Sequence, residues 1–273
     1  MIAQGLESKA VEKGLRFKRA YTGPEKDAFD YFNWGTRHII ITNRDPTKPP
    51  TVDMWGEIPT NWGDKSEIAF EKYAKSADVP GIGRETSVKQ IVHRVVNSIT
   101  HQGLQRGYFS SEEDARVFEQ ELKYILVDQR ASFNSPVWFN VGLHHVYGMK
   151  GKAGRNYAWD YERGETVLVN DNYERPQASA CFIVGIKDDL GDILQQVVRE
   201  GRIFENGSGT GSNFSVYRAE GEPITGGGSA SGPKSWMKIL DTSAGAIKSG
   251  GKTRRAAKMA VFNIDHPDVE KII

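Results

Sequence analysis

A single cysteine is the residue with the clearest capacity for chemistry in this sequence. Cys181 is the only cysteine among 273 residues, and it stands at the start of the apolar run 181–186. Reduction by a thiol pair requires two sulfur atoms within bonding reach, with Cα atoms about 5–6 Å apart. If Cys181 is redox-active, its partner thiol must come from another polypeptide segment. The alternative interpretation is a lone buried cysteine that acts as a small apolar filler.

Three glycines lie close together in the segment Gly207-Ser208-Gly209-Thr210-Gly211. Glycines allow main-chain N–H groups to approach an anion or a base closely. The segment precedes a predicted strand and does not open a helix, so it is not a dinucleotide-binding fingerprint. A nucleotide contact and a plain glycine turn both remain open.

Two charged residues, Asp188 and Arg218, follow successive predicted strands. A carboxylate suits a ribose hydroxyl and a guanidinium suits a phosphate, so the two residues could bind a nucleotide together. As isolated residues they would be a helix cap and a surface charge.

A basic, glycine-rich segment spans residues 250–255 and carries three basic side chains, among them Arg254. It is not a phosphate-binding loop of the Walker type, because Gly245 and Gly251 are separated by five residues where that motif requires four. We interpret the segment as a flexible hinge that bears cations. A solvated basic turn is the alternative.

The elements that must position these residues alternate between strand and helix. Strands are predicted at 181–186, 213–218 and 260–264, with helical patterns over 188–198 and 236–247 between them. Right-handed crossovers between successive strands would give a parallel sheet. The first strand has the composition of a strand buried on both faces. In such sheets ligands gather at the loops that leave the strand ends.

Two helices in the first half of the chain are predicted to be scaffold. Ser87 and Gln90 form a capping box for a helix that continues to Gly103, and a second helix begins at Ser110-Ser111-Glu112-Glu113. We expect their charged side chains on the solvent faces, opposite the apolar stripes.

Composition indicates a globular chain without a strong electrostatic field. The sequence has 36 basic and 35 acidic residues, a net charge of +1 and 38% hydrophobic residues, which favours neither direct DNA binding nor a membrane surface. No run approaches the ~20 apolar residues of a spanning helix, and the start lacks a secretion signal. With one cysteine, a reducing, cytoplasmic location is expected. The six histidines show no metal-ligand spacing, so no metal site is predicted.

Several of these segments, taken in order, resemble the large-subunit family of ribonucleotide reductases, and most closely its class II, adenosylcobalamin-dependent branch. The resemblance covers roughly residues 110–273 and is specific only when its pieces are taken together. The pieces are 134–142, 176–182, 207–213, Arg218, and 250–257 followed by 266–268.

The resemblance implies a substrate site. Cys181 would be one of two thiols that reduce the ribose 2′ position and are oxidised to a disulfide in each turnover. Ser135 and the backbone of Ala180 and Cys181 would hold the phosphates and sugar, a role suited to hydroxyl and amide donors. Gly209 would lie against the substrate nucleotide.

The resemblance also implies an allosteric site. Asp188 and Arg218 would hold a deoxynucleoside triphosphate effector at a dimer interface. Residues 250–255 would form the loop that transmits the identity of the effector to the substrate site, with Arg254 as a base or phosphate contact.

By the same resemblance the fold is α/β, with a mainly helical N-terminal domain over residues 1–131 and the incomplete first half of a ten-stranded α/β barrel over residues 132–273. In the family, the second reducing thiol and most adenosylcobalamin contacts belong to sequence beyond residue 273. The chain is therefore expected to be the N-terminal part of a vitamin B12-dependent ribonucleoside-diphosphate reductase, inactive without a complementary C-terminal segment. A thioredoxin-type reductant and a homodimer are the further partners implied.

Three alternatives stay open. A class I large-subunit fragment is the nearest, although the segment Ser179-Ala180-Cys181-Phe182 and the absence of a recognisable N-terminal regulatory nucleotide domain favour class II. A non-catalytic nucleotide-binding module would keep the effector site without the chemistry. A plain α/β scaffold would bind no deoxynucleotide. The choice between di- and triphosphate substrates also stays open.

Overall fold

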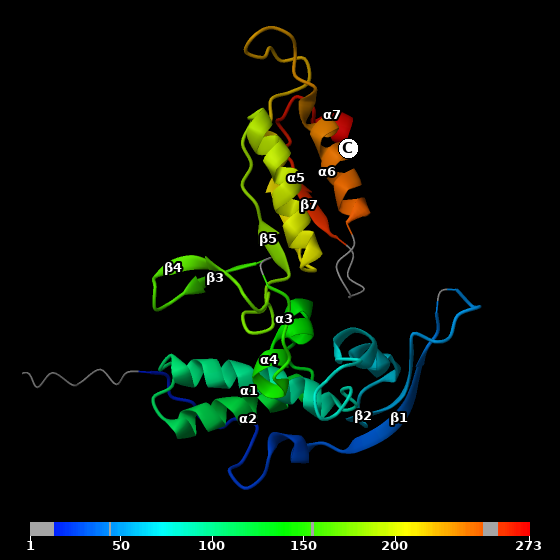
Figure 1. The fold of residues 1–273 in the computed structure, drawn as a ribbon, viewed down its shortest axis with the longest axis vertical. Coiled ribbons are helices and arrows are strands. Elements are labelled where there is room, and N and C mark those ends of the chain that lie inside the picture. The colour runs from blue at the N-terminus through cyan, green and yellow to red at the C-terminus, as the bar shows by residue number, and fades with distance from the viewer. Residues whose placement is uncertain (1–13, 44, 154–155, 248–255) are drawn as a thin grey trace, which may run out of the picture. The chain divides into compact units, whose positions relative to one another are not determined.

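The computed structural model describes residues 14–43, 45–153, 156–247 and 256–273 (Figure 1). The chain forms two compact units. Unit 1 comprises residues 1–133 and 141–151, and unit 2 comprises residues 134–140 and 152–273. The sequence-based boundary at 131/132 lies close to the first point at which the chain passes from one unit to the other, but residues 141–151, which that boundary assigns to the second domain, belong to unit 1.

Unit 1 combines an antiparallel strand pair with helices. Its elements are β1 (Trp34–Ile41), β2 (Val52–Pro59), α1 (Val88–Gln105), α2 (Glu112–Val127) and α4 (Leu143–Tyr147), with 3-10 turns at Ala28–Tyr31 and Asp64–Glu67 and a π-helical turn at Ala69–Tyr73. The capping box predicted at Ser87 and Gln90 is confirmed. At α2 the cap is Ser111, whose hydroxyl accepts a bond from the N–H of Asp114.

The expectation that charged residues of α1 and α2 face solvent is wrong at three positions. Arg94 of α1, and Glu121 and Lys123 of α2, are buried. Each of the three is paired: Lys123 forms ion pairs with Glu119 of the same helix and with Asp27, at 2.8 and 3.6 Å, whereas Arg94 and Glu121 have partners outside their helices. Arg94 donates to both carboxylate oxygens of Glu85, at 2.7 and 3.3 Å, and both residues are 0% exposed. A buried charge is tolerated when it is paired and hydrogen-bonded in this way.

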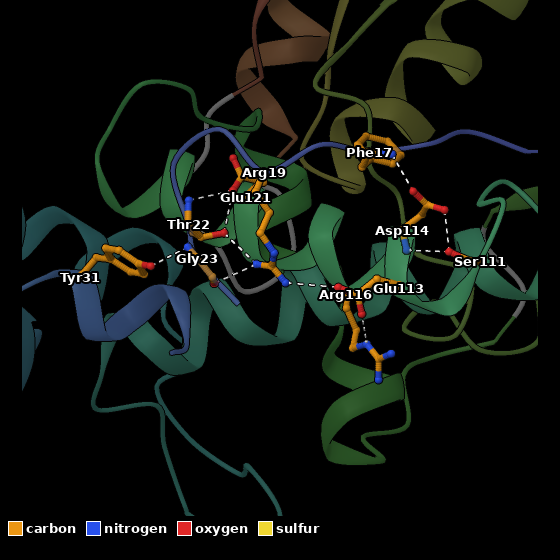
Figure 2. A network of polar contacts seen from close by, with 10 residues as sticks. All are labelled: Phe17, Arg19, Thr22, Gly23, Tyr31, Ser111, Glu113, Asp114, Arg116 and Glu121. Atoms are coloured by element: carbon orange, nitrogen blue, oxygen red, sulfur yellow. Dashed lines mark hydrogen bonds and ion pairs between the residues drawn. The ribbon is translucent and has the colours of Figure 1, made fainter. Parts of the chain in front are cut away.

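Glu121 anchors an N-terminal segment, residues 17–23, on α2 (Figure 2). One carboxylate oxygen accepts bonds from the N–H and hydroxyl of Thr22, at 2.9 and 2.6 Å. The other accepts from the N–H groups of Ala20 and Tyr21, at 3.1 and 2.9 Å. A further carboxylate of the same helix, Asp114, accepts from the N–H of Phe17 at 2.8 Å. The segment is therefore held mainly through its backbone.

Unit 2 contains the predicted three-stranded parallel sheet. Its elements are α3 (Ser135–Asn140), the antiparallel hairpin β3 (Tyr157–Asp160) and β4 (Glu165–Leu168), β5 (Cys181–Ile183), α5 (Leu190–Glu205), β6 (Gly209–Asn213), a 3-10 turn (Phe214–Val216), α6 (Gly232–Ala246), β7 (Lys258–Val261) and α7 (Val269–Ile272). The sheet order is β5-β6-β7. Helices α5 and α6 lie alongside each other (Figure 1), and they share a core of Ile193, Phe214, Tyr217 and Leu240.

The sheet departs from the sequence-based expectation in two ways. The second strand is the glycine-rich β6, whereas the apolar residues after it form a 3-10 turn. The first strand is not buried on both faces, since Ile183 is 81% exposed. Helix α5 packs against one face of β6 only. On the other face, Ile183 and Met259 lie on either side of Gly211, and both side chains are exposed.

The last described element is the short helix α7, which begins at Val269 with Asp268 as its N-cap. No helix among the described residues combines the length and apolar character needed to cross a membrane.

Candidate functional site

Cys181 is exposed and lies at the beginning of β5. The parallel register pairs it with Gly209, the first residue of β6, and the N–H of Gly209 donates to the carbonyl of Ala180 at 2.7 Å. Cys181 and Ile183 point to the same side of the strand, which is the open face of the sheet. The buried-filler interpretation of the cysteine is therefore wrong, and the thiol is accessible beside the glycine segment.

Gly209 is a position where only glycine fits. A Cβ added there would lie 2.8 Å from the carbonyl oxygen of Ala257, the residue before β7. The same oxygen accepts a 3.0 Å bond from the N–H of Thr210. The glycine thus allows β6 and the start of β7 to approach closely. The plain-turn interpretation applies only to Gly207, which precedes the strand with φ +81°.

Hydroxyl and amide groups cluster at the edge where β5, β6 and β7 begin, which we call the amino edge. The buried Ser208 donates to the carbonyl of Ser179 at 2.6 Å and accepts from the side-chain amide of Gln177 at 2.8 Å. Asn140, the last residue of α3, donates to the carbonyl of Gln177 at 3.0 Å. Ser135 is the first residue of that helix, about 7–8 Å from Asn140 along its axis.

The predicted partners Asp188 and Arg218 are brought together. Asp188 lies in the segment after β5, and Arg218 follows the 3-10 turn after β6. Nε of Arg218 donates to the Asp188 carboxylate at 2.6 Å, and both side chains are half-buried. The terminal nitrogens of Arg218 make no bond to any residue that the structure describes, so they remain able to bind an anion.

The two groups of residues occupy opposite ends of the sheet. Cys181 and Gly209 begin their strands, whereas Asp188 and Arg218 follow the strand ends. The five residues of β6 correspond to roughly 13–17 Å at ~3.3 Å per residue. The thiol is therefore not at the carboxyl ends of the strands, where ligands of parallel sheets usually gather. The candidate residues therefore fall into two separate groups.

Arg254 and the rest of the basic segment 250–255 lie outside the described residues. Among the described residues, no three histidine, cysteine or carboxylate side chains are grouped so that they could hold a metal ion.

A buried polar network behind β6 was missed from the sequence. Glu200 of α5 is 2% exposed and accepts a 2.6 Å bond from Nζ of Lys258, at the start of β7. Thr210 and Gln196 donate to its other oxygen at 3.3 and 3.0 Å. Burial lowers the pKa of the Lys258 ammonium, and the bond to Glu200 opposes that shift without cancelling it. The only sequence signal is that Gln196 and Glu200 share a helix face with Ile193 and Phe204.

Comparison with known proteins identifies the family. Residues 56–129 match the model described as class II vitamin B12-dependent ribonucleotide reductase, and residues 179–273 match the ribonucleotide reductase barrel domain. The chain is 50% identical over 223 residues to a vitamin B12-dependent ribonucleotide reductase of Bradyrhizobium diazoefficiens. The aligned residues make up 81% of this chain and 17% of that relative. For the Streptomyces clavuligerus enzyme of the same name, identity is 38%, over 99% of this chain and 25% of the relative.

A solved structure, the Actinobacillus ureae class Id ribonucleotide reductase alpha subunit, aligns with a TM-score of 0.47 and 17% identity, over 77% of this chain and 29% of that one. The chain spans only 17% and 25% of the length of these two curated relatives. Segments in both halves of the chain match ribonucleotide reductase family models. Relatives named vitamin B12-dependent ribonucleotide reductase align along most or all of the chain. The chain belongs to the family of class II, vitamin B12-dependent ribonucleotide reductases.

Proposed function

We propose that this chain is the N-terminal part of an enzyme that converts ribonucleotides to 2′-deoxyribonucleotides by radical chemistry with a redox-active thiol pair. The observation that carries the proposal is the exposed thiol of Cys181 in register with Gly209 at the amino edge. In the overall reaction two thiols are oxidised to one disulfide and give up two hydrogens: one replaces the hydroxyl at C2′ of the ribose, and the other leaves with that hydroxyl as water. Cys181 would supply one of these thiols. The reduced pair would be restored by a thioredoxin-type reductant.

The substrate would bind at the amino edge. Ser135 at the start of α3, with the backbone around Ala180 and Cys181, would hold phosphate and sugar. Gly209 would present its backbone to the nucleotide, and its lack of a side chain supports this placement. Hydrogen bonds from Asn140, and between Gln177 and Ser208, keep these segments in place.

The effector, a deoxynucleoside triphosphate, would bind at the carboxyl ends of the strands. Asp188 would accept a bond from a ribose hydroxyl, and Arg218 would contact a phosphate through its terminal nitrogens. Arg254 would contact the effector or the substrate base. We propose that this site lies at a homodimer interface.

The relatives are named as vitamin B12-dependent enzymes, and we propose adenosylcobalamin as the form of the cofactor here. When bound, it supplies the radical chemistry. The described residues are assigned to substrate and effector, and the cofactor contacts are expected beyond residue 273.

The sheet supports completion by further sequence. Ile183, Met259 and Val261 leave an apolar surface on the open face of the three-stranded sheet. Exposed apolar surfaces and unpaired strand edges of this kind normally receive a partner. We propose that residues 132–273 form the first half of a ten-stranded α/β barrel, that a complementary C-terminal reductase segment completes it, and that the chain alone is inactive. We further propose a cytoplasmic location.

The test is reductase activity of the complete protein with Cys181→Ser. The wild type should form deoxyribonucleotide from ribonucleotide in the presence of adenosylcobalamin and a dithiol reductant. Cys181→Ser should reduce turnover by at least about 100-fold while substrate still binds, because a serine hydroxyl of similar size cannot form the disulfide that supplies the two reducing electrons. Unchanged turnover in Cys181→Ser would overturn the role of this thiol. Deoxynucleotide binding without any turnover by the wild type would favour a non-catalytic nucleotide-binding module.

A further inference from the structure

We infer that Glu200 is a positioning residue for the amino edge, where Cys181 and Gly209 lie, and that it acts from behind the sheet through Thr210 and Lys258. The inference rests on the proposed function, which assigns the amino edge to substrate binding. Its evidence is the geometry of the buried network.

Glu200 contacts both strands that meet at Gly209. One carboxylate oxygen accepts a 3.3 Å bond from the hydroxyl of Thr210 in β6, and the other accepts a 2.6 Å bond from Nζ of Lys258 in β7. Helix α5 thus holds the start of two neighbouring strands with one side chain. Glu200 is 2% exposed and the Lys258 side chain is 12% exposed, so water screens this ion pair little.

Each of the two contacted residues directly follows a residue of the close contact between Gly209 and Ala257. Thr210 follows Gly209, and Lys258 follows Ala257, whose carbonyl oxygen is the atom that a Gly209 Cβ would meet at 2.8 Å. Gly209 in turn donates its N–H to Ala180, the neighbour of Cys181. A displacement of Thr210 or Lys258 would therefore be transmitted through Gly209 to the backbone next to the thiol.

Apolar packing contributes little to this positioning. The residues of β6 are glycine, threonine, serine and asparagine, and the side chains that face α5 meet Gln196 and Glu200. Hydrogen bonds are directional, whereas apolar contacts tolerate small displacements of one element relative to another. Replacing a buried ion pair by apolar residues of similar size is often neutral or stabilising. Such a replacement can therefore change the position of the strands without lowering the stability of the fold.

The experiment compares variants of the complete reductase. Glu200→Leu combined with Lys258→Met replaces the ion pair with apolar side chains. Thr210→Val removes only the hydroxyl contact and leaves the ion pair intact. Arg163→Met is the matched control, because it removes the cation of the exposed ion pair with Asp160 on the β3–β4 hairpin of the same unit.

Four quantities are measured for each variant. They are the thermal midpoint, KM and kcat for ribonucleotide, and the rate at which iodoacetamide alkylates Cys181 in the absence of nucleotide. Mass spectrometry of the peptide that contains Cys181 follows the alkylation. We expect the double variant to retain its thermal midpoint within a few degrees, to raise KM about 10-fold, and to change the alkylation rate at least 5-fold. Thr210→Val should shift KM and alkylation in the same direction by about 2–3-fold. Arg163→Met should match the wild type.

A lowered thermal midpoint with wild-type KM and wild-type alkylation would show that Glu200 only stabilises the fold, and would overturn the inference. If the double variant fails to fold, Thr210→Val decides, because wild-type KM and alkylation in that variant would overturn the inference equally. Absence of reductase activity in the wild type would reject the proposed function, whereas the alkylation rates would still test the positioning of Cys181.

Discussion

The carboxylate of Asp188 accepts a 2.6 Å hydrogen bond from Nε of Arg218, which lies 30 residues further along the chain. The bond orients the guanidinium so that its terminal nitrogens, rather than Nε, are available. An arginine fixed in this way can donate two parallel bonds to a phosphate, which lysine cannot do.

Replacing Arg218 by lysine should weaken deoxynucleoside triphosphate binding while leaving the fold intact. Lysine keeps the positive charge but loses the planar set of donors. We expect the dissociation constant to rise about 10-fold, which corresponds to ~1.4 kcal/mol. The free energy of unfolding should fall by at most ~1 kcal/mol, because the ion pair is partly exposed. Equilibrium dialysis of the complete reductase measures the binding, with Arg163→Lys as the control. Unchanged affinity in Arg218→Lys would remove this residue from the effector site.

Gly209→Ala should damage the amino edge, because the added Cβ would lie 2.8 Å from the carbonyl oxygen of Ala257. Relief requires a backbone shift of β6 or β7, with an expected loss of about 1–3 kcal/mol in the free energy of unfolding. Turnover should fall as well. Gly185→Ala is the matched control, since its Cβ would meet no atom within 4 Å. Equal urea midpoints for the two variants would contradict the close approach.

Arg94→Met should strongly destabilise unit 1. The substitution leaves the carboxylate of Glu85 buried without its cation, with bonds from the N–H of Lys75 and the hydroxyl of Tyr147 at 2.6 and 2.9 Å. Removing one partner of a buried ion pair costs about 3–5 kcal/mol. Arg116→Met, which removes the exposed partner of Glu113, should cost ~0.5 kcal/mol or less. Urea unfolding followed by tryptophan fluorescence measures both, and similar losses for the two variants would refute the buried-pair interpretation.

Glu121 should make the attachment of residues 17–23 sensitive to acid. Burial raises the pKa of this carboxyl, but the bonds from the side chain and backbone of Thr22 and from Ala20 and Tyr21 outweigh burial and hold the pKa below its ordinary value of 4.5. The folded pKa is depressed, so the contribution to stability is complete above the ordinary pKa and is lost as the pH falls through the folded pKa.

The corresponding test compares the wild type with Glu121→Gln by urea unfolding between pH 3 and pH 7. The amide has one acceptor oxygen in place of two, so we expect a loss of about 1–3 kcal/mol at pH 7. The difference between the two proteins should stay constant down to about pH 5 and shrink below pH 4.5. Glu112→Gln, at an exposed position of the same helix, is the control variant. A difference that is independent of pH would contradict the role of the Glu121 charge.

Local sequence patterns predicted the elements whose formation depends on their own residues. The capping box at Ser87 and the apolar stripes identify α1 and α2, and alternating strand and helix patterns identify the parallel sheet. Strand β6 could not be placed in this way. Glycine, threonine and serine have no common preference for a strand, and β6 forms because β5 and β7 bond to it on both sides.

Buried charges were the main failure of the sequence-based prediction. In sequence, Arg94 and Glu121 resemble any solvent-facing helix residues, because their partners lie in other segments. Glu85 precedes Arg94 by nine residues, and Thr22 is 99 residues from Glu121. Of the candidate site, Cys181, Gly209 and the Asp188–Arg218 pair were identified from the sequence, whereas the contacts of Glu200 became visible only in three dimensions.

The route of the chain between the two units limits how the protein can be dissected. It changes unit at 133/134, at 140/141 and again at 151/152. A recombinant fragment that starts at residue 152 would discard α3, and with it Ser135 and the bond from Asn140 to Gln177. One that stops at residue 133 would lose residues 141–151, including the carbonyl of Val141 that accepts from Arg94 at 2.7 Å. Neither half can be obtained intact by a single proteolytic cut.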